Sequence, residues 1–189
     1  MVAESGAVLL DDDARAALVA RLVPRATVIT PNLPEARVLA GAGAGARGRT
    51  DARESTGARE GTGAREGTEA EHLARALHAL GPAAVVVTGG HREEATDTFF
   101  DGETLALIPG DRHPDGAAHG SGCTHASALA AHLALGLTPL EAARAARAIA
   151  AEAVRDGLRE IGRGAGPVDV LGLTRRGAGE CLHVPAAGV

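Results

Sequence analysis

Apolar residues recur along this chain at spacings that predict alternating helices and strands. Residues 11–22 carry them at helical intervals, after aspartates that can cap a helix and before Pro24, which ends it. Residues 26–30 (ATVIT) form a short β-branched run that closes at a proline and an asparagine, which is typical of a buried strand. We therefore expect a helix and then a strand at the start of the chain.

The next segment begins as a helix and then loses its apolar pattern. A helix is expected over residues 34–39, ended by Gly41. Residues 41–68 follow, with the sequence GAREGT at 57–62 and again at 63–68 and almost no large apolar side chain. Because such a composition has little surface to bury, we expect a flexible low-complexity insertion, with an interaction tail of alternating Arg and Glu as the other interpretation.

A second helix and a second strand are expected after the insertion. Thr68 stands three residues before Glu71, the spacing of a capping box, and the apolar face that follows runs to Leu80 before a Gly-Pro pair. Residues 83–88 (AAVVVT) are the most strand-like run in the chain. Together with residues 26–30 they predict a βαβ crossover with two parallel strands, buried on both faces.

The rest of the chain, after the second predicted strand, predicts a hairpin and two helices. An Asp101-Gly102 turn between apolar runs is a strong hairpin signal, and we expect this hairpin at the edge of the sheet. One helix is expected over residues 123–135, and another from a Thr-Pro-x-Glu cap at 138–141 to about residue 155. The tail from Gly162 has little periodicity, so we expect it to be irregular.

Composition narrows the classes of function. The net charge is −5, all 19 cations are arginines, and the aromatic residues are two phenylalanines, which argues against a nucleic-acid partner. No window has the length and apolarity of a membrane span, so we expect no membrane partner either. Cys123 and Cys181 show neither a disulfide framework nor a zinc spacing, so a cytoplasmic protein is expected.

The sharpest chemical feature is the sequence HGSGCT at residues 119–124, a glycine-rich loop that leads into a predicted helix. Small residues let successive N–H groups converge, and the helix N-terminus adds about half a positive charge, so this loop can hold an anion. The same dipole favours a thiolate at Cys123, a candidate general base or nucleophile. A thiol hydrolase would also need a histidine base such as His119 or His125. The structural alternative is a tight turn with a small buried cysteine.

Two further loops follow predicted strands. Asn32 and Glu35, three residues apart after the first strand, are placed to bind Mg²⁺ or its waters, or else to cap the next helix. Residues 89–91 (GGH) follow the strand at 83–88 and taken alone are a turn. Because ligands gather at the carboxyl ends of parallel strands, these loops and residues 119–124 are expected at one edge of the sheet.

Four motifs occur in order along the chain: TPNLPEA at 30–36, VVVTGGH at 85–91 with Asp97 and the hairpin behind it, HGSGCT at 119–124, and GAGPV at 164–168. Together they resemble the hydroxymethylpyrimidine and phosphomethylpyrimidine kinases of thiamine biosynthesis, a branch of the ribokinase superfamily. The HGSGCT motif is specific to the branch that uses cysteine where sugar kinases use aspartate. The resemblance covers nearly all of the chain except the insertion and the tail.

The resemblance implies a ribokinase-like three-layer α/β sandwich with a mostly parallel sheet. It also implies ATP-dependent phosphorylation of 4-amino-5-hydroxymethyl-2-methylpyrimidine and of its monophosphate, with Cys123 as the base that takes the hydroxyl proton. The other implied site residues are Gly120, Ser121 and Gly122 for an anion hole, Thr88, Gly89, Gly90 and His91 beside the ATP phosphates, and Asn32 and Glu35 for Mg²⁺. A loose phosphoryl transition state asks chiefly for in-line positioning and charge neutralisation, which these groups would supply.

The sequence departs from the family pattern at three places, one of which is the poorly matching approach to the HGSGCT loop at residues 111–118. Thr88 stands where the family commonly has a lysine, so Mg²⁺ and the anion hole would neutralise more of the phosphate charge. The match also begins at an internal methionine of the family pattern, without the strands and most of the pyrimidine pocket that precede it. We therefore expect residues 1–170 to be the C-terminal part of a kinase domain, followed by an irregular tail at 171–189.

Such a chain would be a fragment, the product of a mis-started gene model, or a half that needs a partner. The expected partners are a small pyrimidine substrate and either a second copy, as a homodimer, or a missing N-terminal half. Two other functions stay open at this point: a pyridoxal kinase of the same branch, and a nucleotide-binding remnant without turnover.

Overall fold

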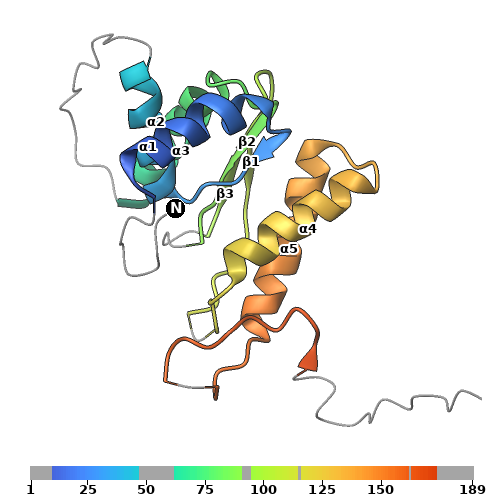
Figure 1. The fold of residues 1–189 in the computed structure, drawn as a ribbon. Helices are drawn as coiled ribbons and strands as arrows, with labels where there is room; N and C mark the ends of the chain where they lie inside the picture. Colours follow the sequence, from blue (N-terminus) through green and yellow to red (C-terminus); the bar gives the residue numbers. More distant parts are fainter. Residues whose placement is uncertain (1–9, 47–61, 91–94, 115, 162, 174–189) are drawn as a thin grey trace, which may run out of the picture. The chain divides into compact units, whose positions relative to one another are not determined.

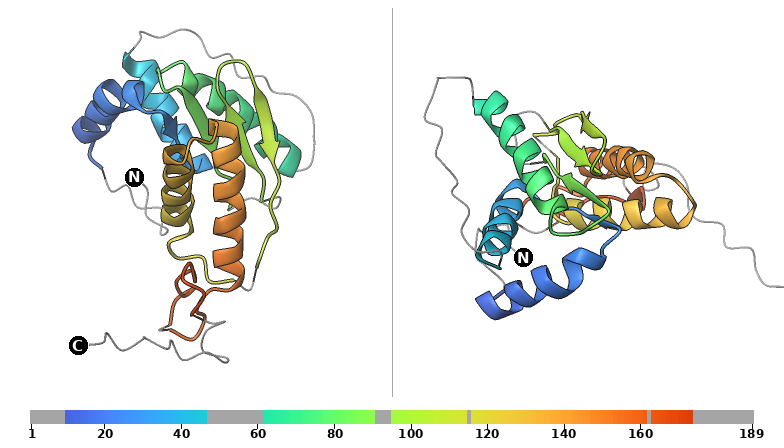
Figure 2. Two further views of the ribbon diagram at one scale, coloured as in Figure 1. Left: turned by 90° about the vertical axis from the view of Figure 1, so that its right-hand side faces the viewer. Right: turned by 90° about the horizontal axis from the view of Figure 1, so that it is seen from above.

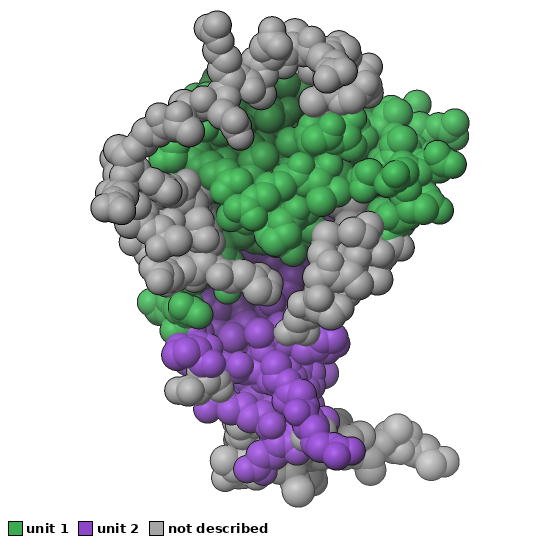
Figure 3. Space-filling model, turned by 90° about the vertical axis from the view of Figure 1, so that its left-hand side faces the viewer, with its two compact units in different colours: residues 1–112, 138–143 green, residues 113–137, 144–189 purple. Residues whose placement is uncertain are grey.

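The computed structural model describes residues 10–46, 62–90, 95–114, 116–161 and 163–173 (Figure 1). The chain divides into two compact units, residues 1–112 with 138–143 and residues 113–137 with 144–189, which Figure 3 colours separately. The first unit holds a four-stranded sheet. The second holds the glycine-rich loop and the helix that carries Cys123.

The sheet of the first unit is mixed, with its strands in the order β1-β2-β3-β4. The strands are β1 (Val28–Ile29), β2 (Ala84–Val87), β3 (Asp97–Phe100) and β4 (Leu105–Ile108). β1 and β2 run parallel, whereas β2 and β3, and β3 and β4, run antiparallel. The parallel crossover and the hairpin at the sheet edge are therefore confirmed, but β1 is half-buried and not buried on both faces as predicted. The described strands are not mostly parallel, because the segments that follow β2 and β3 are too short to cross over the sheet.

The turn between β3 and β4 has the predicted chemistry. The Asp101 Oδ1 atom accepts hydrogen bonds from the N–H groups of Glu103 and Thr104, at 3.1 and 2.7 Å. Gly102 has a φ of 99°, a conformation that favours glycine, and a Cβ there would lie 2.9 Å from the His78 ring. The Asp-Gly pair therefore fixes the hairpin both by its backbone and by its small size.

Helices α2 (Leu33–Ala46) and α3 (Thr62–His78) pack together, and α3 lies against β2 and β3 (Figures 1 and 2). β2 is buried along its whole length, as the continuous apolar run predicted. The buried core between the helices and the sheet consists of Val19, Leu33, Ala36, Leu39, Ala70, Ala74, Leu77, Val85, Val87 and Phe100. Alanines at the helix positions let the helices approach closely despite the scarcity of large side chains.

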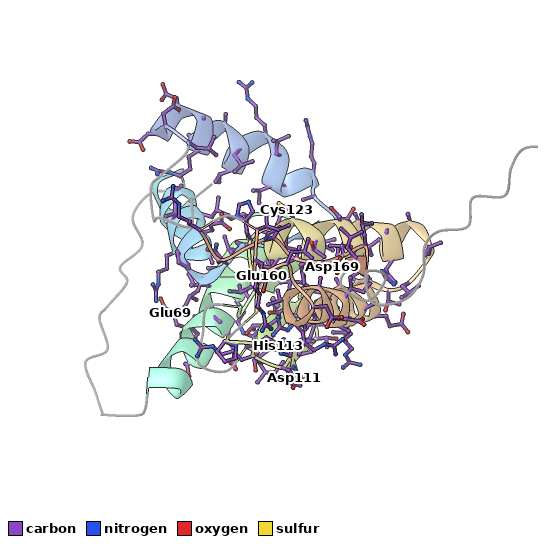
Figure 4. The ribbon with its side chains drawn as sticks, turned by 90° about the horizontal axis from the view of Figure 1, so that it is seen from below. Glu69, Asp111, His113, Cys123, Glu160 and Asp169 are labelled. Carbon is purple, nitrogen blue, oxygen red and sulfur yellow. The ribbon has the colours of Figure 1, made fainter. Side chains whose placement is uncertain are left out.

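One ion pair joins α2 to α3 at the surface. Arg37 donates through Nε and Nη2 to the two carboxylate oxygens of Glu69, both at 2.7 Å; Glu69 is labelled in Figure 4. The hydrogen bond from Arg37 lowers the pKa of the Glu69 carboxyl, burial opposes this, and the positive charge of Arg37 adds to the lowering. The bidentate pair therefore adds a surface contact between two helices that pack through a buried core.

Both helices extend into the segment predicted as an insertion. α2 continues past Gly41 to Ala46, and α3 begins at Thr62 instead of Thr68. The predicted helix boundaries at Gly41 and Thr68 were therefore wrong. Residues 47–61, the rest of that segment, lie outside the described residues.

Tertiary packing explains why α2 passes through its glycines. A Cβ on Gly43 would lie 2.6 Å from Leu80 Cδ2, so glycine at this position lets α2 pack against the Leu80 side chain without moving it. Ala42 packs partly buried against the core as well. These contacts offset the weak helix propensity of glycine, which by itself predicted an end to the helix.

The first helix is shorter and less regular than its pattern suggested. α1 (Asp12–Ala17) is followed by a π-helical turn η1 (Leu18–Leu22) and a 3₁₀ turn η2 (Val23–Arg25). Asp11 caps α1 as predicted, because its side chain accepts a hydrogen bond from Ala14 N–H at 2.7 Å. Proline at the second position of η2 is compatible with this tight terminal turn.

Two long helices complete the described chain. α4 (Ser121–Ala134) lies in the second unit, and α5 (Pro139–Arg155) runs through parts of both. The predicted capping box of α5 is confirmed: Thr138 N–H donates to Glu141 Oε2 at 3.0 Å, and Glu141 N–H donates to Thr138 Oγ1 at 3.4 Å. The described residues 163–173 consist mainly of bends and turns with one isolated bridge, in keeping with the irregular tail expected there.

Candidate functional site

The carboxyl ends of the two parallel strands meet, as the crossover predicted. Asn32, after β1, forms an isolated parallel bridge with Thr88, after β2. The Thr88 N–H donates to the Pro31 carbonyl oxygen at 2.9 Å. The loops that carry Asn32 and Thr88 therefore lie side by side at one edge of the sheet, where open α/β sheets bind ligands.

Asn32 and Glu35 cap helix α2 with each other's side chains. The Asn32 Oδ1 atom accepts from Glu35 N–H at 2.9 Å, and Glu35 Oε2 accepts from Asn32 N–H at 3.2 Å. This reciprocal pair is a capping box, so the structural alternative proposed from the sequence is confirmed. It also fixes both side chains at the sheet edge, which is where a phosphate-bound cation would need them.

The donor set at this edge fits one kind of magnesium site. Within the described ranges, His, Cys, Asp and Glu side chains form no group of three that could hold a metal ion. Asn32 and Glu35 supply one amide oxygen and one half-buried carboxylate. Mg²⁺ commonly keeps several waters and binds through one or two carboxylates and substrate phosphates, so this pair fits a Mg²⁺ that arrives with a nucleotide.

The turn after β2 is built from two glycines with different surroundings. Gly89 is buried, and a Cβ on it would overlap the backbone of Thr96, so no other residue fits without moving that strand. Gly90 is exposed, and a Cβ there would meet no described heavy atom within 4 Å. His91, the last residue predicted beside the nucleotide, lies outside the described residues.

Asp97 also belongs to this turn, and sequence reasoning gave it no site role. It is the first residue of β3, it is fully buried, and its Oδ1 atom accepts from Gly89 N–H at 2.7 Å. The available signal was a carboxylate at the start of an otherwise apolar buried strand. Because a buried carboxylate needs hydrogen-bond donors, this signal could have indicated a nearby N–H group that donates to Asp97.

The second part of the site is the N-terminus of α4. Gly120 precedes the helix with a φ of 90°, and no side chain caps the helix. Ser121 N–H donates to Ala118 O at 3.1 Å, whereas the N–H groups of Gly122 and Cys123 find no acceptor among the described residues. Open N–H groups at a helix N-terminus can bind an anion, but of the predicted anion-hole residues Ser121 already donates its N–H within the loop. The anion hole at Gly120, Ser121 and Gly122 stays a prediction.

The place where a Gly122 side chain would lie is open. A Cβ on Gly122 would meet no described heavy atom within 4 Å, so nothing in the described fold requires glycine there. The Cys123 thiol is exposed at the start of α4 (Figure 4), which contradicts the alternative of a small buried cysteine. Thr124 steadies the turn instead, because its hydroxyl donates to Gly120 O at 3.0 Å.

The GAGPV segment holds the loop before α4 in place. His119 N–H donates to Gly166 O at 3.1 Å, Val168 N–H donates to His119 O at 3.0 Å, and His119 bridges Pro167 in parallel. Gly166 has a φ of 73°, and a Cβ there would overlap Leu158 O. A motif distant in sequence therefore sets the backbone that leads into Gly120, a contact that the sequence pattern did not reveal.

The predicted site residues thus fall into two groups. Asn32, Glu35, Thr88 and Gly89 come together at the sheet edge of the first unit. Gly120 to Cys123 come together at the helix N-terminus of the second unit. The expectation that both groups serve one edge stays a prediction.

In the part of the chain that is described, no helix is long and apolar enough to cross a membrane.

Comparison with known proteins identifies the family. Residues 1–169 match the family model described as phosphomethylpyrimidine kinase. The chain belongs to this family. It is 43% identical over 171 residues to a hydroxymethylpyrimidine/phosphomethylpyrimidine kinase of Rhizobium meliloti, a match that covers 89% of this chain and 57% of the relative. The corresponding protein of Synechococcus elongatus is 37% identical over 171 residues, with the same coverage.

A solved structure confirms the ribokinase-like α/β fold. An ADP complex of Bacillus subtilis pyridoxal kinase is similar with a TM-score of 0.69 and 31% identity, over 88% of this chain and 56% of that one. The chain therefore spans a little more than half the length of the relatives it matches. The matched part of the phosphomethylpyrimidine kinase family includes both groups of predicted site residues.

Proposed function

We propose that this chain serves the ATP-dependent phosphorylation of 4-amino-5-hydroxymethyl-2-methylpyrimidine and then of its monophosphate. Family membership and two relatives named as hydroxymethylpyrimidine/phosphomethylpyrimidine kinases support this substrate class. The ADP complex of the similar pyridoxal kinase supports an adenine nucleotide as the donor. A small-molecule kinase also agrees with the net charge of −5, which does not favour nucleic acid as a partner.

The observation that carries this proposal is the uncapped N-terminus of α4, with two open N–H groups beside an exposed thiol. In the proposed reaction the Cys123 thiolate takes the proton of the substrate hydroxyl. The hydroxyl oxygen then forms a bond to the γ-phosphorus while the bond to the bridging oxygen of ADP breaks. The N–H groups of Gly122 and Cys123 stabilise the charge on the transferred phosphoryl oxygens, and Gly120 and Ser121 shape the turn that aims them.

The sheet edge would hold the nucleotide side of the reaction. Residues 88–91 would border the phosphates of ATP through their backbone, and Asn32 and Glu35 would bind Mg²⁺ or its waters. Mg²⁺ supplies charge neutralisation and orientation of the phosphates when bound. Thr88 adds no positive charge, so the backbone groups and the cation account for most of the electrostatic stabilisation.

A phosphorylation assay of the full chain tests the proposal. With ATP, Mg²⁺ and hydroxymethylpyrimidine, removal of the base in Cys123→Ala should lower kcat about 100-fold or more, without a change in the urea midpoint. Cys123→Ser, of nearly the same size, should be almost as slow, because a serine hydroxyl is a poor base. Unchanged turnover in Cys123→Ala would refute the base assignment. ADP binding without turnover by the unchanged chain would favour the non-catalytic remnant or the half of a split kinase.

Pyridoxal phosphorylation is the second candidate function. It is favoured by the similarity to pyridoxal kinase, whose TM-score of 0.69 extends over 88% of this chain. The same assay with pyridoxal in place of the pyrimidine separates the two. A higher kcat/KM for pyridoxal than for hydroxymethylpyrimidine would replace the first proposal by the second. Sedimentation of the full chain would show whether it forms a homodimer, one of the two partners expected from the sequence beside a missing N-terminal half.

A further inference from the structure

We infer that Asp97 is a positioning residue that fixes the turn at residues 88–90 for the nucleotide. The inference rests on the proposed function, because the turn bears on phosphoryl transfer only if it borders the nucleotide phosphates. Asp97 does not need to touch the nucleotide in this role. It acts through the backbone N–H of Gly89, the group to which it is joined.

The local chemistry shows what Asp97 contributes. Its side chain has no exposed surface, and its Oδ1 atom lies 2.7 Å from Gly89 N. A bond from an N–H group to a carboxylate is shorter and stronger than one to a neutral acceptor. Burial of a carboxylate costs free energy, and an apolar residue would suit a buried strand better. The bond to the turn is therefore a reason for an acid at this position.

Asp97 completes a two-sided restraint on the turn. On one side, Thr88 N–H donates to Pro31 O at 2.9 Å, which ties the turn to the segment after β1. On the other side, Asp97 ties the next N–H group, that of Gly89, to the start of β3. Gly89 also packs against the Thr96 backbone too closely for a side chain. The two consecutive N–H groups are thus fixed by both neighbouring strands, whereas Gly90 beyond them is exposed.

This arrangement predicts that the two neighbouring strands hold the backbone groups of the nucleotide site in position. Backbone groups that receive phosphates must be held within a fraction of an ångström, and sites supported by neighbouring strands are more precise than free loops. Without the hydrogen bond to Asp97, the Gly89 peptide loses one of its restraints, and Gly90 beyond it is held less firmly. Nucleotide affinity should then fall although no contact to the nucleotide has been removed.

Three variants of the full chain test the inference. Asp97→Asn keeps an oxygen that can accept from Gly89 N–H, and Asp97→Ala removes it. Thr98→Val is the matched control, because Thr98 is the next residue of the same strand, is fully buried, and has a hydroxyl without a partner among the described residues. The measurements are ADP binding by calorimetry, hydrogen exchange of the Gly89 amide by NMR, and the urea midpoint of each variant.

In Asp97→Ala, the hydrogen-exchange rate of the Gly89 amide should rise about tenfold or more, as expected for the loss of a hydrogen bond to a charged acceptor. Its affinity for ADP should fall about tenfold, because the backbone groups that bind the nucleotide would be misplaced. Asp97→Asn should stay within about threefold of the unchanged chain in affinity, because the acceptor remains. Thr98→Val should bind ADP as the unchanged chain does.

Two results would overturn the inference. If Asp97→Ala is folded and binds ADP unchanged, Asp97 does not position the nucleotide site. If Asp97→Asn loses as much affinity as Asp97→Ala, the acceptor oxygen is not the cause. Should Asp97→Ala not fold, the near-isosteric Asp97→Leu replaces it in both comparisons. If the unchanged chain binds no ADP, the proposed function and the effect on affinity fail together, and the exchange rate of Gly89 alone decides whether Asp97 fixes the turn.

Discussion

Gly89 and Gly122 illustrate two different reasons for a glycine in the two groups of predicted site residues. Gly89 is buried, and the backbone of Thr96 occupies the space where its Cβ would be, so the fold itself requires glycine. Gly122 is exposed, and no described atom lies near its absent side chain. A glycine that the fold does not require, at a helix N-terminus with open N–H groups, points to a ligand that needs the space.

Gly122→Ala is the strongest way to break this comparison. A methyl group there should exclude the transferred phosphoryl group and lower kcat/KM about 100-fold, close to 2.7 kcal/mol. Stability should not fall, and it should rise by up to about 1 kcal/mol, because alanine is the better helix former. Turnover measured beside urea unfolding checks both parts of this prediction.

Gly41→Ala is the matched control for that variant. Gly41 is exposed in the middle of α2, and a Cβ there also meets no described atom within 4 Å. It should gain a similar stability, about 1 kcal/mol, and keep full activity. Equal activity of the two variants would show that the open space at Gly122 has no role in the reaction.

Gly89→Ala tests the other side of the comparison. Its methyl group would overlap the Thr96 backbone, so the strand must shift, and we expect a loss of about 2 kcal/mol in the free energy of unfolding. Gly90→Ala, one residue along and in open space, should change stability by less than about 0.5 kcal/mol. Similar urea midpoints for the two variants would contradict the packing argument.

Glu35→Gln separates the capping role of Glu35 from its proposed role at Mg²⁺. Glutamine keeps an oxygen for Asn32 N–H, so the capping box and the stability should persist. The Mg²⁺ concentration for half-maximal activity should rise about tenfold, because the carboxylate charge is lost. Glu141→Gln, in the equivalent capping box of α5, should leave the Mg²⁺ dependence unchanged. An unaltered Mg²⁺ dependence in both variants would leave Glu35 with the capping role alone.

The smallest expected effect concerns the ion pair between α2 and α3. Because Arg37 lowers the pKa of Glu69 in the folded chain, the pair stabilises the fold at pH values above the ordinary pKa of the carboxyl. That contribution is lost as the pH falls through the lowered pKa. Glu69→Gln should cost about 0.5 kcal/mol at neutral pH, a value that reflects the exposure of the pair. The difference should vanish in acid and shrink in 1 M salt; a difference independent of pH would exclude the ion pair as its cause.

Local elements of the fold could be predicted where one pattern dominated. The buried run of β2, the Asp101-Gly102 hairpin and the capping box of α5 each depend on neighbours within a few residues, and each appears in the structure. The ends of α2 and α3 could not be predicted in this way. Glycine at 43 opposes a helix locally, and only contact with Leu80 shows why the helix continues.

Some residues of the candidate site could likewise be predicted from the sequence, and others could not. The motif residues Asn32, Gly89 and Cys123 were identifiable because their chemistry and spacing resemble a known family. Asp97 was not assigned a role, since its hydrogen bond crosses from one strand to the turn after another. The support of the loop at residues 119–124 by the GAGPV segment was equally hidden, because backbone hydrogen bonds carry no signal in side-chain patterns.

The sequence by itself determined the chemistry available to this protein: a thiol, two glycine-rich turns and a capping pair, all at ends of regular elements. Tertiary structure decided which backbone N–H groups donate to an acceptor within the described chain and which do not. Asp97 occupies the N–H of Gly89, whereas those of Gly122 and Cys123 have no acceptor in the described chain. The physical reason is that hydrogen-bond partners distant in sequence are chosen by packing, which local propensity does not encode.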